Sequence, residues 1–132
     1  MKQLILFSAI FLTLGVASAH EGHDKTPGAL AAPHGGVVKG TDHIYLELVT
    51  ESGGIKVYPL NHDTKPIPVA DVKLEGKMSI PRKNKAETVK FTVDGDHFVA
   101  KVDAKGAHRY DLDVTVTHGG KAEKLKFSVE PQ

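Results

Sequence analysis

The chain has no cysteine and no tryptophan among its 132 residues, and it has almost no excess of either charge. The absence of cysteine excludes disulfides, thiol nucleophiles, and zinc or iron–sulfur sites held by thiolates. The 17 Lys and Arg residues nearly balance the 16 Asp and Glu residues. Proteins that bind nucleic acid through its phosphates need clustered cations, so no nucleic-acid partner is expected.

Histidine is the abundant residue type, with eight copies against three Tyr and five Phe. Neutral imidazole is the commonest side-chain ligand of zinc, copper and nickel. Catalytic patterns are weaker: no serine lies in a Gly-x-Ser-x-Gly elbow. The carboxylate pairs Asp94/Asp96 and Asp111/Asp113 fit a hairpin turn and the solvent face of a strand. The composition therefore favours metal binding over an enzyme.

The first nineteen residues are typical of a cleaved secretory signal peptide. Residues 1–3 are a short basic start, residues 4–16 are apolar, and residues 17–19 form a small-x-small cleavage pattern. The apolar run is shorter than the roughly 20 residues that a membrane-spanning helix needs. We expect export to the periplasm or the medium, with His20 as the first residue of the mature protein and no membrane span after cleavage.

Beyond the first third of the chain, apolar residues alternate with polar ones, as they do in β-strands. No window of helical length shows a 3.6-residue period. The predicted strands are 43–50, 55–60, 69–74, 87–93, 97–102, 110–117 and 122–129, and residues 78–86 are predicted to be an exposed connection. About seven short strands separated by turns predict an all-β, antiparallel, immunoglobulin-like sandwich over residues 34–132. Residues 20–33 are expected to be a mobile tail.

Three placements make histidines candidate metal ligands. At the mature N-terminus, His20 would offer both its α-amine and its imidazole to one ion, and His23 and Asp24 add donors close by. His34 lies in a Pro-His-Gly-Gly sequence, where the glycines leave its ring accessible. His43 begins a predicted strand. The remaining four histidines lie in or beside predicted loops, at positions 62, 97, 108 and 118, where they are either further donors or polar surface residues, and the surface interpretation is favoured.

The Pro-His-Gly-Gly sequence is followed by the strands at 43–49 and 55–58 and then by Lys-Pro-Ile-Pro at 65–68. This arrangement resembles the small N-terminal domain of periplasmic adaptors in heavy-metal efflux pumps of the cobalt–zinc–cadmium and copper–silver types. Residues 94–98 and 106–114 are similar to YtkA-like immunoglobulin-type domains. The resemblance implies a freestanding module that passes a metal ion to an efflux complex or sequesters it, and only His34 is carried over from the motif.

The sequence thus predicts a periplasmic, non-enzymatic protein that binds a divalent transition metal, copper or zinc. The expected ligands are His20, His23, Asp24 and His34, with His43 as a further candidate. Affinity should fall below about pH 6 as imidazoles become protonated. The alternative is an immunoglobulin-like structural or interaction module of the cell envelope with incidental histidines. The exposed strand edges and the basic loop at 82–85 support this alternative.

Overall fold

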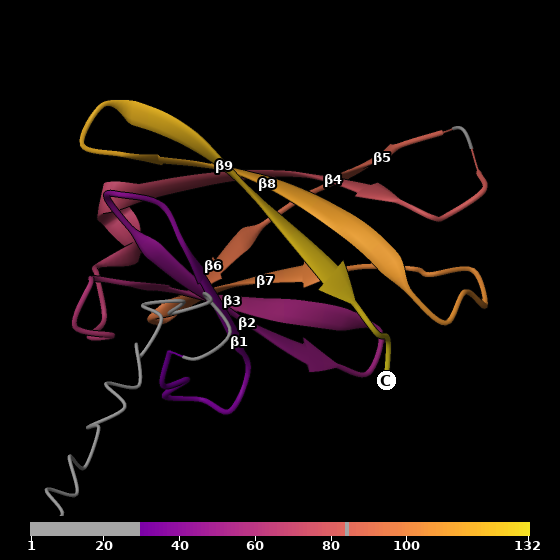
Figure 1. Ribbon diagram of the computed structural model, residues 1–132, viewed down its shortest axis with the longest axis horizontal. Helices are drawn as coiled ribbons and strands as arrows, with labels where there is room; N and C mark the ends of the chain where they lie inside the picture. Colours follow the sequence, from indigo (N-terminus) through magenta and orange to yellow (C-terminus); the bar gives the residue numbers. More distant parts are fainter. Residues whose placement is uncertain (1–29, 84) are drawn as a thin grey trace, which may run out of the picture.

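The computed structural model describes residues 30–83 and 85–132. Over these residues, nine strands form two antiparallel sheets that pack face to face (Figure 1). The strand order is β1-β2-β3-β7-β6 in the first sheet and β5-β4-β8-β9 in the second. The predicted all-β antiparallel sandwich is confirmed, with nine strands instead of about seven.

The strands are three to nine residues long, and three of the eight connections between them are two-residue hairpin turns. Their bounds are β1 Val37–Gly40, β2 Tyr45–Glu51, β3 Gly54–Leu60, β4 Val72–Ser79, β5 Glu87–Val89, β6 Thr92–Asp94, β7 His97–Lys101, β8 Tyr110–His118 and β9 Lys121–Val129. The predicted signal peptide, residues 1–19, lies outside the described residues, as do residues 20–29 of the predicted tail. In the part of the chain that the structure describes, no helix has the length and apolar character needed to cross a membrane.

The prediction around β4 is wrong at both ends. Val69–Asp71 form a single 3-10 turn, η2, in which the Asp71 amide donates to the Pro68 carbonyl at 3.0 Å. The strand then continues to Ser79, so Met78 and Ser79 belong to it and not to the exposed connection predicted at 78–86. Its alternation is hard to see in the sequence because the core-facing position between Leu74 and Met78 is a glycine, which has no side chain to mark the buried face.

The predicted strand 87–93 is divided between the two sheets. β5 pairs with β4 in the second sheet, whereas β6 pairs with β7 in the first. The chain crosses from one sheet to the other at Lys90 and Phe91. A Cβ built on Gly76 would lie only 2.8 Å from the ring of Phe91. The aromatic ring thus fills the space that Gly76 leaves open, and this packing holds the crossing in place.

The core lies between the sheets and takes alternate residues from most strands. Its fully buried members (2% exposed or less) include Ile44, Leu46, Ile55, Val57, Tyr110, Leu112, Val114, Val116, Phe127 and Val129. Two further apolar side chains, Val38 and Leu60, are equally buried but pair in register with Glu47 and Tyr45, which alternate with the core-facing residues of β2. The outer face of the first sheet is therefore partly covered, and the candidate site lies there.

Candidate functional site

A row of polar side chains crosses the outer face of the first sheet. Glu47 of β2 pairs in register with Tyr58 of β3, and His97 of β7 pairs with Asp94 of β6. The register of β3 with β7 places Tyr58 beside His97. Residues paired across antiparallel strands project from the same face of a sheet. Four neighbouring strands therefore contribute Glu47, Tyr58, His97 and Asp94 to one surface.

Glu47 is the only buried charged side chain among the described residues, and its exposed fraction is 0%. Its Oε1 accepts hydrogen bonds from the backbone amides of His34 at 2.8 Å and Gly36 at 3.0 Å. Its Oε2 lies 2.8 Å from Nδ1 of the His34 ring. A carboxylate removed from water is costly unless its oxygens are hydrogen-bonded. The segment around His34 supplies all three of these partners.

The Pro-His-Gly-Gly sequence forms the turn that covers Glu47. The Gly35 amide donates to the Ala32 carbonyl at 3.0 Å, with Pro33 in the second position of the turn, where its fixed φ is favourable. Gly35 has a φ of +75°, a conformation that glycine adopts without strain. A Cβ on Gly36 would overlap the carbonyl group of Leu48. Gly35 is thus required for its positive φ, and Gly36 because no side chain fits beside the Leu48 carbonyl group.

Three rings are stacked above this face. The His34 and Tyr58 ring centroids are 3.6 Å apart with an interplanar angle of 12°, and those of Tyr58 and His97 are 4.7 Å apart at 29°. At these centroid distances, the His34 and His97 imidazoles would overlap each other if both lay over the same face of Tyr58. The two imidazoles therefore lie on opposite faces of the phenol ring. The phenol separates them, and one ion cannot bind both in this arrangement.

The contact with Glu47 fixes which nitrogen of His34 is available. An ionised carboxylate only accepts hydrogen bonds, so the imidazole donates to it from Nδ1. In the neutral ring Nε2 then carries the lone pair, and the side chain is 35% exposed. Metal-binding histidines almost always donate their other ring N–H to a carboxylate, a carbonyl or water, which fixes the tautomer and the ring orientation. His34 has the arrangement of such a ligand.

His97 is held by the hairpin between β6 and β7. Its Nδ1 lies 2.9 Å from Oδ1 of Asp96, and this hydrogen bond is the main reason that the pKa of Asp96 is below its usual value. The nearby His34 lowers the same pKa to a smaller extent. Nε2 of His97 is buried and has no hydrogen-bond partner among the described residues, and Oδ2 of Asp94 is 3.8 Å away. His97 is therefore only 14% exposed and part of the stack, whereas the sequence suggests a surface residue.

His43 lies elsewhere, in the bend before β2. Its Nδ1 is 2.7 Å from Oε1 of Glu123, and Nζ of Lys121 donates to its Nε2 at 3.2 Å. Both partners belong to β9, so His43 connects the two sheets at this end of the sandwich. A metal ion at its Nε2 would have to displace the Lys121 ammonium. Among the described residues, no hydrogen bond or ion pair joins His43 or its partners to His34.

The other predicted ligands, His20, His23 and Asp24, lie outside the described residues. Within residues 30–83 and 85–132, no three His, Asp or Glu side chains are placed to hold one metal ion. The structure thus joins one predicted ligand, His34, to three residues that were not predicted, Glu47, Tyr58 and His97. Glu47 gave a weak signal, as a charged residue in the middle of a predicted strand, on the face that also carries Tyr45 and Val49.

No family model, no curated protein and no solved structure matches the chain. The resemblance to the efflux adaptors and to the YtkA-like domains therefore stays an expectation. A β-sandwich hosts many unrelated functions, so only the chemistry of the site can indicate what this one does.

Proposed function

We propose that this protein binds a divalent transition-metal ion, copper or zinc, with Nε2 of His34 as one ligand. The observation that carries the proposal is the 2.8 Å contact between His34 Nδ1 and the buried carboxylate of Glu47. A carboxylate behind an imidazole fixes the orientation of the ring and, in the neutral ring, leaves the lone pair on the far nitrogen. The stack on Tyr58 further restricts rotation of the ring.

The available donor atoms favour a divalent ion over copper(I). Thiolate and thioether ligands select copper(I), whereas imidazole and carboxylate suit copper(II), zinc and nickel. The chain has no cysteine and only two methionines. Met78 is 3% exposed within the core, and Met1 falls in the predicted signal peptide. Nitrogen and oxygen donors therefore remain, and among divalent ions the Irving–Williams order favours copper(II).

His34 needs further ligands, and we assign them to His20, His23 and Asp24. His23 lies eleven positions before His34, a length of chain that reaches about 35–40 Å when extended. The two imidazoles therefore have ample chain to approach each other. The N-terminal histidine would add its amine after signal cleavage. His43 is the weaker candidate because Lys121 lies against its Nε2.

The predicted signal peptide and the resemblance to adaptor domains support a periplasmic location. There the protein would hand its ion to a heavy-metal efflux complex or sequester it.

The experiment is a calorimetric titration of the mature protein, His20 to Gln132, with zinc(II) and copper(II). His34→Gln should weaken binding by at least about tenfold because a ligand is lost. Glu47→Gln should weaken it by about 10–100-fold, since an amide donor facing Nδ1 forces the ring proton onto Nε2. Circular dichroism would confirm that both variants keep the β-sandwich.

His108→Gln is the matched control, because His108 is exposed in the loop before β8, away from the stacked rings. It should bind both ions like the wild type. Equal affinity of His34→Gln and the wild type would contradict the proposal and would favour a structural or interaction module with incidental histidines.

A further inference from the structure

The second sheet has an incomplete edge beside β4. All of β4, from Val72 to Ser79, pairs with β8 on one side. On the other side β5 pairs only with Gly76, Lys77 and Met78, and no described strand pairs with Val72–Glu75. In an antiparallel sheet, alternate residues direct their N–H and C=O groups to opposite edges. Part of the backbone of Val72–Glu75 is thus left without a strand partner.

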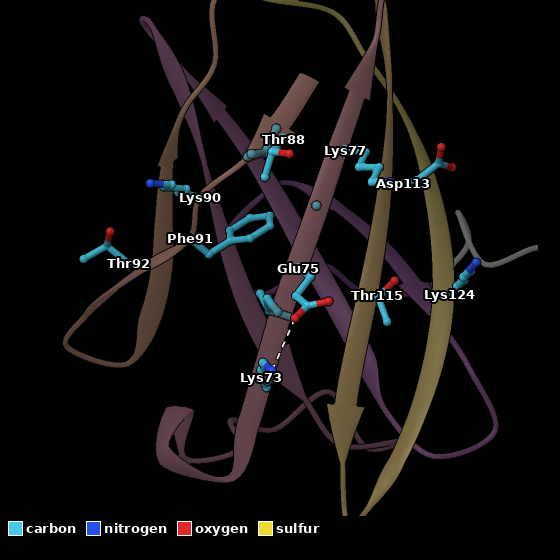
Figure 2. Close-up of a pocket in the computed structure, with 13 residues that line it drawn as sticks. Lys73, Glu75, Lys77, Thr88, Lys90, Phe91, Thr92, Asp113, Thr115 and Lys124 are labelled. Carbon is cyan, nitrogen blue, oxygen red and sulfur yellow. Dashed lines mark ion pairs between the residues drawn. The ribbon is translucent and has the colours of Figure 1, made fainter. Parts of the chain in front are cut away.

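A groove of about 950 Å³ lies along this edge. The open edge of β4 and the chain between β5 and β6 border it, and Leu74, Val89 and Phe91 contribute apolar surface. It also extends over the outer face of the second sheet to Asp113, Thr115 and Lys124. Figure 2 shows the ring of Phe91 pointing toward β4. The groove exists because the chain leaves the second sheet at Lys90 instead of continuing beside the first half of β4. An extended segment placed in this groove would therefore run alongside β4 and could pair with the backbone of Val72–Glu75.

The charge around the groove is positive. Lys73 belongs to the unpaired half of β4 and Lys90 to the crossing after β5, whereas Lys77 pairs with Thr88 of β5 and Lys124 lies on β9, beyond β8. The carboxylates of Glu75 and Asp113 also line the groove. Lys73 and Glu75 form an exposed ion pair at 3.3 Å, and no other ion pair of these six residues occurs in the described part of the chain. Figure 2 shows Lys90 beside Phe91 and Lys73 next to Glu75 on β4, whereas Lys124 lies on the far side of β8. The chain as a whole has a formal charge of only +1, so this concentration of lysines is local.

We propose that this groove binds an extended, acidic segment of a partner protein, which adds to the second sheet as a strand beside Val72–Glu75. Strand addition uses main-chain hydrogen bonds for affinity and side-chain contacts for specificity. Lysines at a sheet edge oppose pairing between two positively charged edges. A second copy of this chain would bring the same lysines together, whereas glutamates or aspartates on an incoming strand would be attracted to them.

The test uses a fluorescein-labelled peptide, Gly-Val-Glu-Val-Glu-Val-Glu-Gly, with blocked ends, titrated with the mature protein. We expect saturable binding, and amide NMR shifts confined to residues 72–77 and 88–92. The double substitution Lys73→Glu and Lys90→Glu should weaken binding at least about fivefold by charge reversal. The same charge change at Lys65 and Lys101, which lie outside the groove, is the control and should leave the affinity unchanged.

Two further peptides separate strand addition from simple charge attraction. A peptide with lysine in place of glutamate should not bind, and neither should the acidic peptide with every central amide N-methylated. Full binding of the methylated peptide would overturn the proposal, because that peptide cannot donate backbone hydrogen bonds. No saturable binding up to about 1 mM would also overturn it, as would self-association of the protein through this edge in analytical ultracentrifugation.

Discussion

At Glu47 a carboxylate is removed from water and held by two backbone amides and one imidazole. Hydrogen bonds to a charged group contribute about 1.5–3 kcal/mol each, and a buried charge that loses its partners is more costly still. The residue thus fastens the turn at His34 to the sheet and also sets the tautomer of the ring. A stabilising interaction and the proposed ligand geometry depend on the same side chain.

The sequence predicts His34 through its motif but not Glu47, because burial of Glu47 depends on a contact between residues thirteen positions apart. The same holds for His97, whose place in the stack follows from pairing between β3 and β7. Residue types and local spacing identify a donor. They do not reveal which side chains the sheet register places beside it.

Asp96 gives a prediction at the scale of one residue. Its hydrogen bond with His97 lowers the pKa of the carboxyl below 3.8 in the folded protein. A depressed folded-state pKa adds stability above the unfolded value, and this contribution is lost as the pH falls through the folded value. The stability advantage of the wild type over Asp96→Asn should therefore shrink below about pH 4.

Urea unfolding of both proteins between about pH 6 and pH 2 measures this difference. Asp42→Asn is the control, because the Asp42 side chain is exposed and has no hydrogen bond among the described residues. A stability difference that stays constant over the whole range would show that the bond to His97 does not depend on the charge of Asp96.

At the scale of elements, the turns were easier to predict than the strand boundaries. The hairpin at Asp94–His97 was expected, and Gly95 has the positive φ that its turn requires. The β8–β9 hairpin was also expected, and Gly119 and Gly120 both have positive φ. The division of 87–93 between two sheets could not be predicted, because its cause is the packing of Phe91 against Gly76, which are far apart in sequence.

The two glycines of the turn at His34 should differ in their response to substitution. Gly36→Ala places a Cβ against the Leu48 carbonyl group and should lower the free energy of unfolding by about 1–3 kcal/mol. Gly35→Asn should cost much less, since asparagine tolerates positive φ and no atom lies within 4 Å of the new Cβ.

Chemical denaturation gives both values, and zinc titration of the same variants shows whether a displaced turn also weakens binding. Gly36→Ala should lower metal affinity, because its amide no longer positions the Glu47 carboxylate. Equal stability of Gly36→Ala and the wild type would mean that the turn is not held against β2 as described.

For the whole molecule, the fold class follows from the two-residue period, and the sandwich is confirmed with two more strands than expected. The sequence does not predict which side chains are buried on the outer face of the first sheet. Val38, Glu47 and Leu60 are buried there, beneath the turn at His34 and the loop after β3. Burial on both sides of a sheet weakens the alternation from which a covered face is recognised. This second buried layer is the platform for the proposed site.

The most direct test of the metal proposal is long-range proton–nitrogen NMR of the histidine rings in the mature protein, before and after addition of zinc(II). Without metal, the neutral His34 ring should carry its proton at Nδ1 and its lone pair at Nε2. Zinc should shift the Nε2 resonance of His34 strongly, while Nδ1 keeps its proton on Glu47. A zinc-saturated protein in which neither His34 nitrogen shifts, or in which Nδ1 is the nitrogen that binds, would contradict the proposal.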